Sequence, residues 1–212
     1  MKKYIVLAGN IGAGKSTLVG AISDKLNWKP YYEPVSENPY LEDFYADMER
    51  WAFHSQMYFL TDRLKTHKSL QTYGGSVVQD RSVYEDAEIF ARNLYNQRSF
   101  TEKDFTTYWE MYKVMTSFLE PPDLVVYLRA PLATLKKRIT LRGREFEADI
   151  PDTYLSDLNV LYEEWIESFD MAPKLILNAD EIDIVRNPVD LDFIIPRIKE
   201  ALRGGQTELF EE

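Results

Sequence analysis

The chain has 212 residues, which is enough for one α/β domain with a sizeable core. Its net charge of −10 argues against a surface that binds nucleic-acid duplexes, because such a surface needs a basic face. The absence of cysteine excludes disulfides, thiolate metal sites and a cysteine nucleophile. No apolar run approaches the roughly 18 residues of a membrane span, and the N-terminal apolar run is shorter than a signal peptide core. We therefore expect a soluble, cytoplasmic protein.

Short β-rich runs alternate with long helical patterns along the chain. Strands are predicted at 4–8, 29–33, 76–80, 124–128 and 174–178. Helices are predicted at 15–26, 38–71, 82–97, 101–119, 131–142, 151–170 and 188–202. This alternation predicts an α/β fold with a five-stranded parallel sheet and helices on both faces. We expect a single domain over 1–204 and a flexible tail over 205–212.

The first predicted strand is followed by the segment GNIGAGKST, residues 9–17. The segment fits G-x-x-x-x-G-K-[ST], and its position between a strand and a helix is the one that this motif requires. Such a loop wraps a phosphate in backbone N–H groups at the positive end of a helix. We expect it to bind a nucleoside triphosphate, with Lys15 on the β- and γ-phosphates and Ser16 on Mg²⁺. The residues expected to bind the nucleotide here are Gly9, Asn10, Ile11, Gly12, Ala13, Gly14, Lys15, Ser16 and Thr17. The motif alone does not distinguish a switch, a motor and a kinase.

Charged residues stand at the ends of the second and third predicted strands. Ligands bind beyond the carboxyl ends of parallel strands, so Glu33, Asp80 and Arg81 are expected on the same edge as the phosphate loop. Glu33 is a candidate general base for an attacking hydroxyl, and Asp80 is a candidate Mg²⁺ ligand. Arg81 is a candidate to bind an anion or to orient Glu33. The alternatives are a surface role for Glu33 and a helix-capping role for Asp80.

The long predicted helix at 38–71 carries a polar stripe. Tyr45, Gln56 and Arg63 are separated by 11 and 7 residues, which are close to whole numbers of helical turns. The three side chains are therefore expected on one face, where a phenol, an amide and a guanidinium suit a nucleobase and a sugar. A solvated stripe on an amphipathic helix is the alternative.

The next predicted helix, 82–97, carries Asp86, Phe90 and Asn93 at positions i, i+4 and i+7. This spacing also predicts a shared face. Asp86 is positioned to pair with Arg63, and Phe90 to stack on a ring.

A basic segment, KKRITLRGREFE, covers residues 136–147 of this acidic protein. Arg138 and Arg142 are one helical turn apart, and Arg144 follows shortly after. Three arginines in a short segment suit a lid over a transferring phosphoryl group. The alternative is a basic surface, or a set of charges that stabilises the carboxyl end of the helix.

Other classes of nucleotide-binding protein share some of these features. A nucleoside monophosphate kinase, such as one acting on thymidylate, needs extra basic residues for the acceptor phosphate. A nucleotide-dependent switch usually carries D-x-x-G and N-K-x-D elements, and DRSV at 80–83 is not the first of these. A dinucleotide-binding dehydrogenase fits the sequence least well. Its loop reads G-x-G-x-x-G, whereas the loop of this chain does not match that pattern and carries Lys15.

The chain resembles the deoxyribonucleoside kinases, in the group of deoxycytidine, deoxyguanosine and deoxyadenosine kinases and closest to compact bacterial members. The resemblance covers nearly the whole chain. It rests on GNIGAGKST, EPV at 33–35, WAFHSQMYFLTDR, DRSVYED, FARNLY, the RGR of the lid and NADEID. It implies transfer of a phosphoryl group from ATP, with Mg²⁺, to the 5′-hydroxyl of a deoxynucleoside, with deoxyadenosine favoured and deoxycytidine or deoxyguanosine next.

The resemblance also implies roles for individual residues. The implied catalytic set is Lys15, Glu33, Arg81, Arg138, Arg142 and Arg144, with Ser16 and Asp80 at the metal. Gln56, Arg63, Asp86 and Phe90 are implied to contact the nucleobase, and Tyr45 and Glu147 the 3′-hydroxyl. Besides the phosphate loop, the implied nucleotide-binding residues are Arg138, Arg142, Asn178, Asp180 and Ile182. A homodimer joined through helices is expected, and neither a nucleic acid nor a membrane is expected as a partner.

Overall fold

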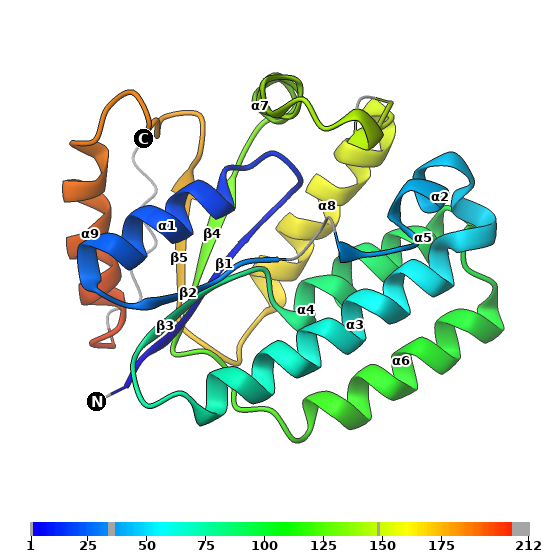
Figure 1. Cartoon of the computed structure of the whole chain (residues 1–212), viewed down its shortest axis with the longest axis horizontal. Coiled ribbons are helices and arrows are strands. Elements are labelled where there is room, and N and C mark those ends of the chain that lie inside the picture. The colour runs from blue at the N-terminus through cyan, green and yellow to red at the C-terminus, as the bar shows by residue number, and fades with distance from the viewer. Residues whose placement is uncertain (1, 34–36, 148, 205–212) are drawn as a thin grey trace.

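A five-stranded parallel sheet forms the centre of the protein (Figure 1). The computed structural model describes residues 2–33, 37–147 and 149–204. The strands are β1 (Tyr4–Gly9), β2 (Lys29–Tyr31), β3 (Val77–Asp80), β4 (Leu124–Arg129) and β5 (Lys174–Asn178). Their order across the sheet is β2-β3-β1-β4-β5, and all four pairings are parallel. The predicted α/β fold is therefore confirmed, with β2 two residues shorter than expected.

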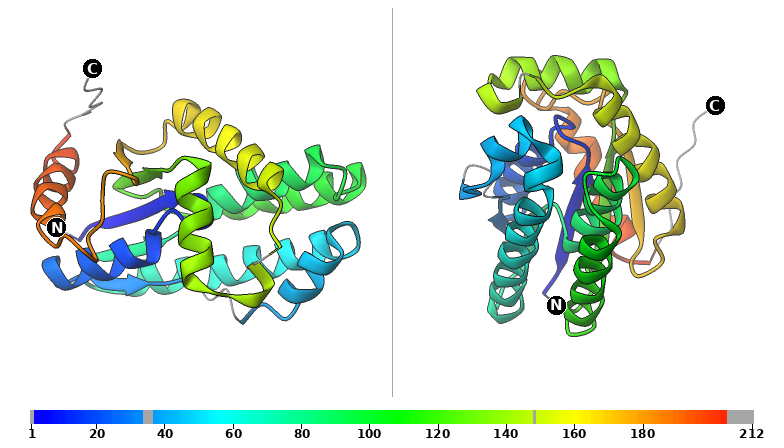
Figure 2. Two further views of the ribbon diagram at one scale, coloured as in Figure 1. Left: turned by 90° about the horizontal axis from the view of Figure 1, so that it is seen from above. Right: turned by 90° about the vertical axis from the view of Figure 1, so that its right-hand side faces the viewer.

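Helices cover both faces of this sheet (Figure 2). The helices are α1 (Lys15–Leu26), α2 (Leu41–Ala46), α3 (Met48–Thr72), α4 (Val83–Glu85), the π-helix η2 (Asp86–Ala91), α5 (Arg92–Asn96), α6 (Glu102–Thr116), α7 (Leu132–Arg142), the 3₁₀-helix η3 (Glu145–Glu147), α8 (Asp152–Ser168) and α9 (Asp190–Ala201). The helix α7 lies across the carboxyl ends of the strands, above the phosphate loop (Figures 1 and 2).

The two faces of the sheet bury different kinds of side chain. The core under α1 and α9 is aliphatic and includes Ile5, Val19, Ile22 and Ile198. The opposite core, shared by α3, α6, α8 and η2, is rich in buried aromatic rings, among them Tyr108, Tyr127 and Tyr162. A sheet buried on both faces requires near-continuous apolar strands, which explains the sequences YIVLAG of β1 and LVVYLR of β4.

The single helix predicted at 38–71 is wrong, because the segment forms two helices, α2 and α3. Asp47 separates them with a non-helical backbone, at φ −147° and ψ 84°. Its carboxylate accepts the backbone N–H of Arg50 at 3.1 Å, as an N-cap does. Tyr45 therefore lies on α2, and the spacing argument that placed it on one helix with Gln56 and Arg63 does not hold.

The helix predicted at 82–97 contains a full π-turn. The segment Asp86–Ala91 forms η2 between the short helices α4 and α5. A π-turn alters the angular step between residues and is frequent at functional sites. Asp86 and Phe90 line the main cavity, whereas Asn93 is buried elsewhere, so the predicted face is only partly retained.

Two sequence predictions fall on residues outside the described part of the chain. They are the tail at 205–212 and the residues Pro34 and Val35 of the EPV segment. Within the described residues, no helix has the length and apolar character needed to cross a membrane.

Candidate active site

A cavity of about 660 Å³ opens at the carboxyl ends of the strands. We define its donor side as the phosphate loop with α7 and the segment 179–186. We define its acceptor side as Glu33, Tyr45, Gln56, Asp86 and Phe90, all of which line the cavity. Arg81 and Asp80 lie in the wall as well.

The phosphate loop has the backbone that an anion site needs. Gly12 and Gly14 have φ angles of 82° and 97°, which side chains with a Cβ rarely adopt. A Cβ on Gly12 would also meet the carbonyl oxygen of Leu135 at 2.8 Å. The helix α1 then begins at Lys15 and presents free N–H groups and a positive dipole end to the cavity.

Lys15 is buried at the base of this loop. Its Nζ donates to the carbonyl oxygens of Gly9 at 2.8 Å and Asn10 at 3.0 Å. Burial and, second, the positive charge of Arg81 lower the pKa of Lys15 to about 8. Phosphate oxygens are acceptors that would replace these carbonyls and favour the charged form.

Ser16 and Asp80 meet at the opening of the loop. The Ser16 hydroxyl donates to Asp80 Oδ2 at 2.5 Å. The other oxygen, Asp80 Oδ1, is buried and has no partner within the described residues. A carboxylate oxygen beside a hydroxyl is the oxygen ligand set that Mg²⁺ prefers when phosphates complete its shell, so these two residues fit the expected ion.

A network of buried ion pairs holds Glu33. Arg63 Nη2 donates to Glu33 Oε1 at 2.7 Å, and Arg63 Nε donates to Asp86 Oδ2 at 2.9 Å. Arg81 Nε lies 3.3 Å from Glu33 Oε2. Burial raises the pKa of Glu33, but Arg81 and Arg63 outweigh it, and the net direction is downward. Glu33 is therefore ionised at neutral pH.

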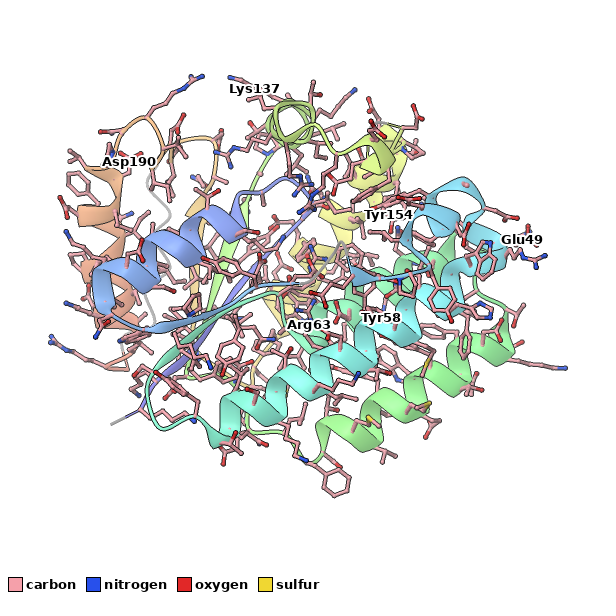
Figure 3. All side chains as sticks on the ribbon, in the orientation of Figure 1. Glu49, Tyr58, Arg63, Lys137, Tyr154 and Asp190 are labelled. Atoms are coloured by element: carbon pink, nitrogen blue, oxygen red, sulfur yellow. The ribbon has the colours of Figure 1, made fainter. Side chains whose placement is uncertain are left out.

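Arg63 differs from the sequence prediction in its position. It is 3% exposed and is not in the cavity wall. It lies near the centre of the molecule and reaches from α3 toward the strand ends (Figure 3). It bridges the candidate base Glu33 and the wall residue Asp86 from behind, so the predicted pair with Asp86 is confirmed, whereas the contact with Glu33 was not predicted.

Aromatic rings and one amide complete the acceptor side. The guanidinium of Arg81 lies over the Phe90 ring, 4.1 Å from its centre. Gln56 is 3% exposed, and its Oε1 has no partner among the described residues. Tyr45 stacks with Phe146 of η3 at 6.0 Å between ring centres.

The lid arginines are paired with protein groups. Arg138 donates to the carbonyl oxygens of Ala13 at 2.7 Å, Ala179 at 2.5 Å and Ile182 at 3.0 Å. It thus joins the phosphate loop to the segment 179–186, where the sequence predicted contact with phosphate.

The other two lid arginines share a carboxylate. Both Arg142 and Arg144 donate to Glu147, and the distance from Arg144 is 3.2 Å. Glu147 is 3% exposed and lines the cavity, so these arginines orient it toward the acceptor.

Three predicted nucleotide-binding residues are not in the cavity wall: Gly9, Asn10 and Asn178. The Asn10 amide instead donates to Leu155 O at 2.9 Å and to Asn159 Oδ1 at 2.7 Å, which ties the loop to α8. Asn178 lines a separate shallow depression. The remaining predicted residues of the loop, with Asp180 and Ile182, do line the cavity.

Several wall residues were not predicted from the sequence. They are Leu41, Phe44, Phe59 and Tyr154 around the acceptor and Thr134, Lys137 and Arg186 around the donor. Phe59 lies one turn after Gln56, so helical spacing could have found it. Tyr154 comes from α8 and approaches from the other side of the cavity, which no local spacing indicates.

A phosphate loop that faces an ionised carboxylate across one cavity, beneath an arginine-bearing helix, defines a kinase of the phosphate-loop class. The sequence matches the deoxynucleoside kinase family over residues 5–203. The chain belongs to this family, and it is an enzyme that phosphorylates deoxynucleosides.

Relatives of known activity support this assignment. The deoxyadenosine/deoxycytidine kinase of Bacillus subtilis is 38% identical, over 95% of this chain and 94% of its own. A deoxyguanosine kinase of Lactobacillus acidophilus is also 38% identical, over 94% and 90%. A structure of deoxyadenosine kinase from M. mycoides with the products dCMP and dCDP has a TM-score of 0.83 and 33% identity, over 93% of this chain and 99% of the other.

Proposed function

We propose that the enzyme transfers the γ-phosphoryl group of ATP to the 5′-hydroxyl of deoxyadenosine, and of deoxycytidine or deoxyguanosine less effectively. The observation that carries the proposal is the placement of Lys15, Ser16 and Asp80 opposite Glu33 and Arg81 in one cavity. The family assignment is to the deoxynucleoside kinases. We therefore do not retain a nucleoside monophosphate kinase or a nucleotide-dependent switch as alternative functions.

Glu33 acts as the general base. Its ionised carboxylate takes the proton of the 5′-hydroxyl as that oxygen attacks the γ-phosphorus. The new O–P bond forms while the bond to the β-phosphate bridging oxygen breaks, and ADP leaves. Arg81 lies beside Glu33 at 3.3 Å, where it orients the base and offsets charge on the transferring group.

The donor side holds the triphosphate. Lys15 and the first N–H groups of α1 bind the phosphate oxygens, and Arg138 keeps the loop against the segment 179–186. Arg142 at the end of α7 and Arg144 just after it close the cavity and keep water out. Mg²⁺ held by Ser16 and Asp80 would supply positive charge on the β- and γ-phosphates.

The acceptor side supports a base with an exocyclic amino group. The unpartnered Gln56 Oε1 is a hydrogen-bond acceptor in the cavity wall, and the carboxylate of Asp86 stands in the same wall. Adenine and cytosine both present an amino group where guanine presents a carbonyl. The relatives named for deoxyadenosine and deoxycytidine agree with this preference.

Stacking and sugar contacts follow from the same wall. Phe90 stacks on the base, and Tyr45 and Glu147 bind the 3′-hydroxyl. The position of all three residues in the cavity wall supports these roles. A Glu147 carboxylate fixed by Arg142 and Arg144 favours a sugar that offers a hydroxyl donor there.

We also propose that residues 1–204 form one domain and that two copies associate in the cytoplasm. Val114 and Phe118 of the α6 region are 58% and 77% exposed, which supports an interface on that side. Sedimentation velocity at micromolar protein concentration measures the oligomeric state, and a monomer there contradicts the dimer.

The decisive experiment measures initial rates of phosphoryl transfer from Mg-ATP to the four deoxynucleosides, adenosine and deoxythymidine monophosphate. Deoxyadenosine is expected to have the highest kcat/KM. Glu33→Gln is expected to lower kcat by about three orders of magnitude, because the glutamine amide cannot accept the proton of the 5′-hydroxyl. Glu163→Gln is the matched control, since Glu163 pairs with Arg129 away from the main cavity.

Two results contradict the proposal. Full activity of Glu33→Gln would remove Glu33 from the role of base. A higher kcat/KM for deoxyguanosine than for deoxyadenosine would overturn the assigned base preference while leaving the chemistry in place.

A further inference from the structure

Glu85 is a fully buried carboxylate that lies behind the active site and outside the cavity wall. It is the last residue of α4, and its Oε2 accepts the backbone N–H of Ser82 at 2.9 Å and the Ser82 hydroxyl at 3.2 Å. The Ser82 side-chain oxygen in turn accepts the backbone N–H of Glu85, and the two reciprocal side-chain-to-backbone contacts form a capping box. A capping box needs only the start of a helix, and it functions equally well at an exposed site.

The second oxygen of Glu85 has other partners. Its Oε1 accepts the backbone N–H of Gly9 at 3.2 Å and the Tyr162 hydroxyl at 2.9 Å. The Tyr162 hydroxyl is also 2.7 Å from the Gly9 carbonyl oxygen. One carboxylate therefore joins the first residue of the phosphate loop, the turn after β3 and the helix α8.

The burial of this charge needs an explanation. Removing a carboxylate from water costs more than a capping box returns. Burial raises the pKa of Glu85, and the charges of Arg81 and Lys15 oppose that rise. The two cations that offset the charge of Glu85 are thus the two that act on the phosphates.

The turn that Glu85 holds carries Arg81 in an unusual conformation. Arg81 has a φ of 64°, which is rare for a residue with a Cβ and persists only where the surroundings enforce it. Its N–H donates to Leu7 O at 3.0 Å on one side. On the other side the next residue, Ser82, is bound by Glu85 through both its backbone and its hydroxyl.

We propose that Glu85 is a positioning residue that locks the turn of Asp80 and Arg81 to the first residue of the phosphate loop. Arg81 is thereby held against Glu33 while Asp80 faces Ser16, so that donor and acceptor sides stay in register. This inference rests on the proposed function, since the alignment matters only if Glu33 and Arg81 act in the transfer.

The test compares Glu85→Gln with the wild type in steady-state kinetics and in the pH profile of kcat/KM for the deoxynucleoside. The glutamine amide has nearly the shape of the carboxylate, but its NH₂ group is a donor. Both oxygens of Glu85 accept hydrogen bonds, so this NH₂ group must face a donor. We expect kcat to fall by at least about tenfold while KM for the deoxynucleoside changes by less than about threefold. We expect the acid limb to move to higher pH, because a loosened Arg81 no longer lowers the pKa of Glu33 as strongly.

Glu88→Gln is the matched control. Glu88 is a neighbouring, half-buried glutamate that also accepts a tyrosine hydroxyl, that of Tyr112, and its side-chain hydrogen bond within the described residues does not involve the phosphate loop. A structural role alone would make the two variants alike, with lower melting temperatures and unchanged pH profiles. Tyr162→Phe removes one partner of Glu85 and is expected to show the same kinetic pattern at smaller size.

The outcomes separate the two proposals. The positioning role is overturned if Glu85→Gln has the kcat and the acid limb of the wild type. It is also overturned if Glu88→Gln shows the same fall in kcat and the same shift of the acid limb as Glu85→Gln. Either result holds even when Glu33→Gln is inactive. If Glu33→Gln is active, the proposed function fails first. If Glu85→Gln does not fold, a kcat loss with a shifted acid limb in Tyr162→Phe supports the inference, and wild-type behaviour overturns it.

Discussion

The phosphate loop on the donor side of the cavity is one continuous stretch, whereas the acceptor side is assembled from distant segments. Residues 11–18 all line the cavity, and we propose that they hold the nucleotide mainly through backbone groups. The acceptor residues Tyr45, Gln56, Asp86 and Glu147 come from α2, α3, η2 and η3, and we propose that each binds the deoxynucleoside through its side chain. A loop that binds phosphate through its backbone tolerates few substitutions, because its conformation depends on all of its residues. Side chains that contact the base from separate elements can instead be substituted one at a time. Base preference can therefore vary within one fold while the phosphate site stays constant.

The largest expected effect comes from removing the donor-side cation. Lys15→Met is expected to lower kcat by about three orders of magnitude, because the charge on the transferring phosphoryl group loses its fixed partner. Rapid-quench or steady-state assays with saturating deoxyadenosine measure it. Lys25→Met is the control on the same helix, since Lys25 is half exposed and pairs with Asp192. Retention of kcat in Lys15→Met would show that the donor side does not depend on this residue.

A smaller effect is expected on the acceptor side from Arg63→Lys. Lysine keeps the charge but cannot bind Glu33 and Asp86 at once with a planar fork. We expect kcat/KM for the deoxynucleoside to fall by about 30-fold, with KM for ATP unchanged. Arg129→Lys, in the more exposed pair with Glu163, is the matched control. An equal rise in KM for ATP would mean that the two sides are not separable.

The pH dependence sharpens the comparison further. The pKa of Lys15 is about 8, so its charge is lost as the pH rises above that value. We expect kcat/KM for ATP to fall about tenfold per pH unit on the alkaline side, since this ratio reports the free enzyme. The variant Lys15→Arg stays protonated and should lack that limb, whatever its absolute rate. If the wild type and Lys15→Arg show the same alkaline limb, that limb reports the titration of a group other than Lys15.

The smallest effect is expected at the break between α2 and α3. Asp47→Ala removes the N-cap of α3 and should lower the free energy of unfolding by about 1 kcal/mol. Because Tyr45 lies two residues before the cap, KM for the deoxynucleoside should rise by about threefold. Denaturant unfolding and initial rates measure the two effects. A change in KM for ATP alone would contradict the assignment of α2 to the acceptor side.

Sequence reasoning was most successful where structure is local. The five strands and the phosphate loop were found because period, burial pattern and glycine positions depend on neighbouring residues. Glu33, Asp80 and Arg81 were placed on the correct edge because all parallel strands end there. The break at Asp47 was missed because an aspartate inside a helical pattern carries little local signal. The π-turn of η2 was missed because its register depends on packing against α8 and α3.

By itself, the sequence determined the sheet and the site edge, since each follows from local spacing and from the geometry common to parallel sheets. The kind of chemistry was indicated by the resemblance of the sequence to a known kinase family. Only the tertiary structure decided which partners the charged side chains take. It showed Arg63 reaching Glu33 in addition to the predicted partner Asp86, Arg138 bound to three carbonyls, and Glu85 buried behind the phosphate loop. The physical reason is that a long charged side chain reaches several partners, and the lowest free energy among them depends on groups brought together from distant parts of the chain.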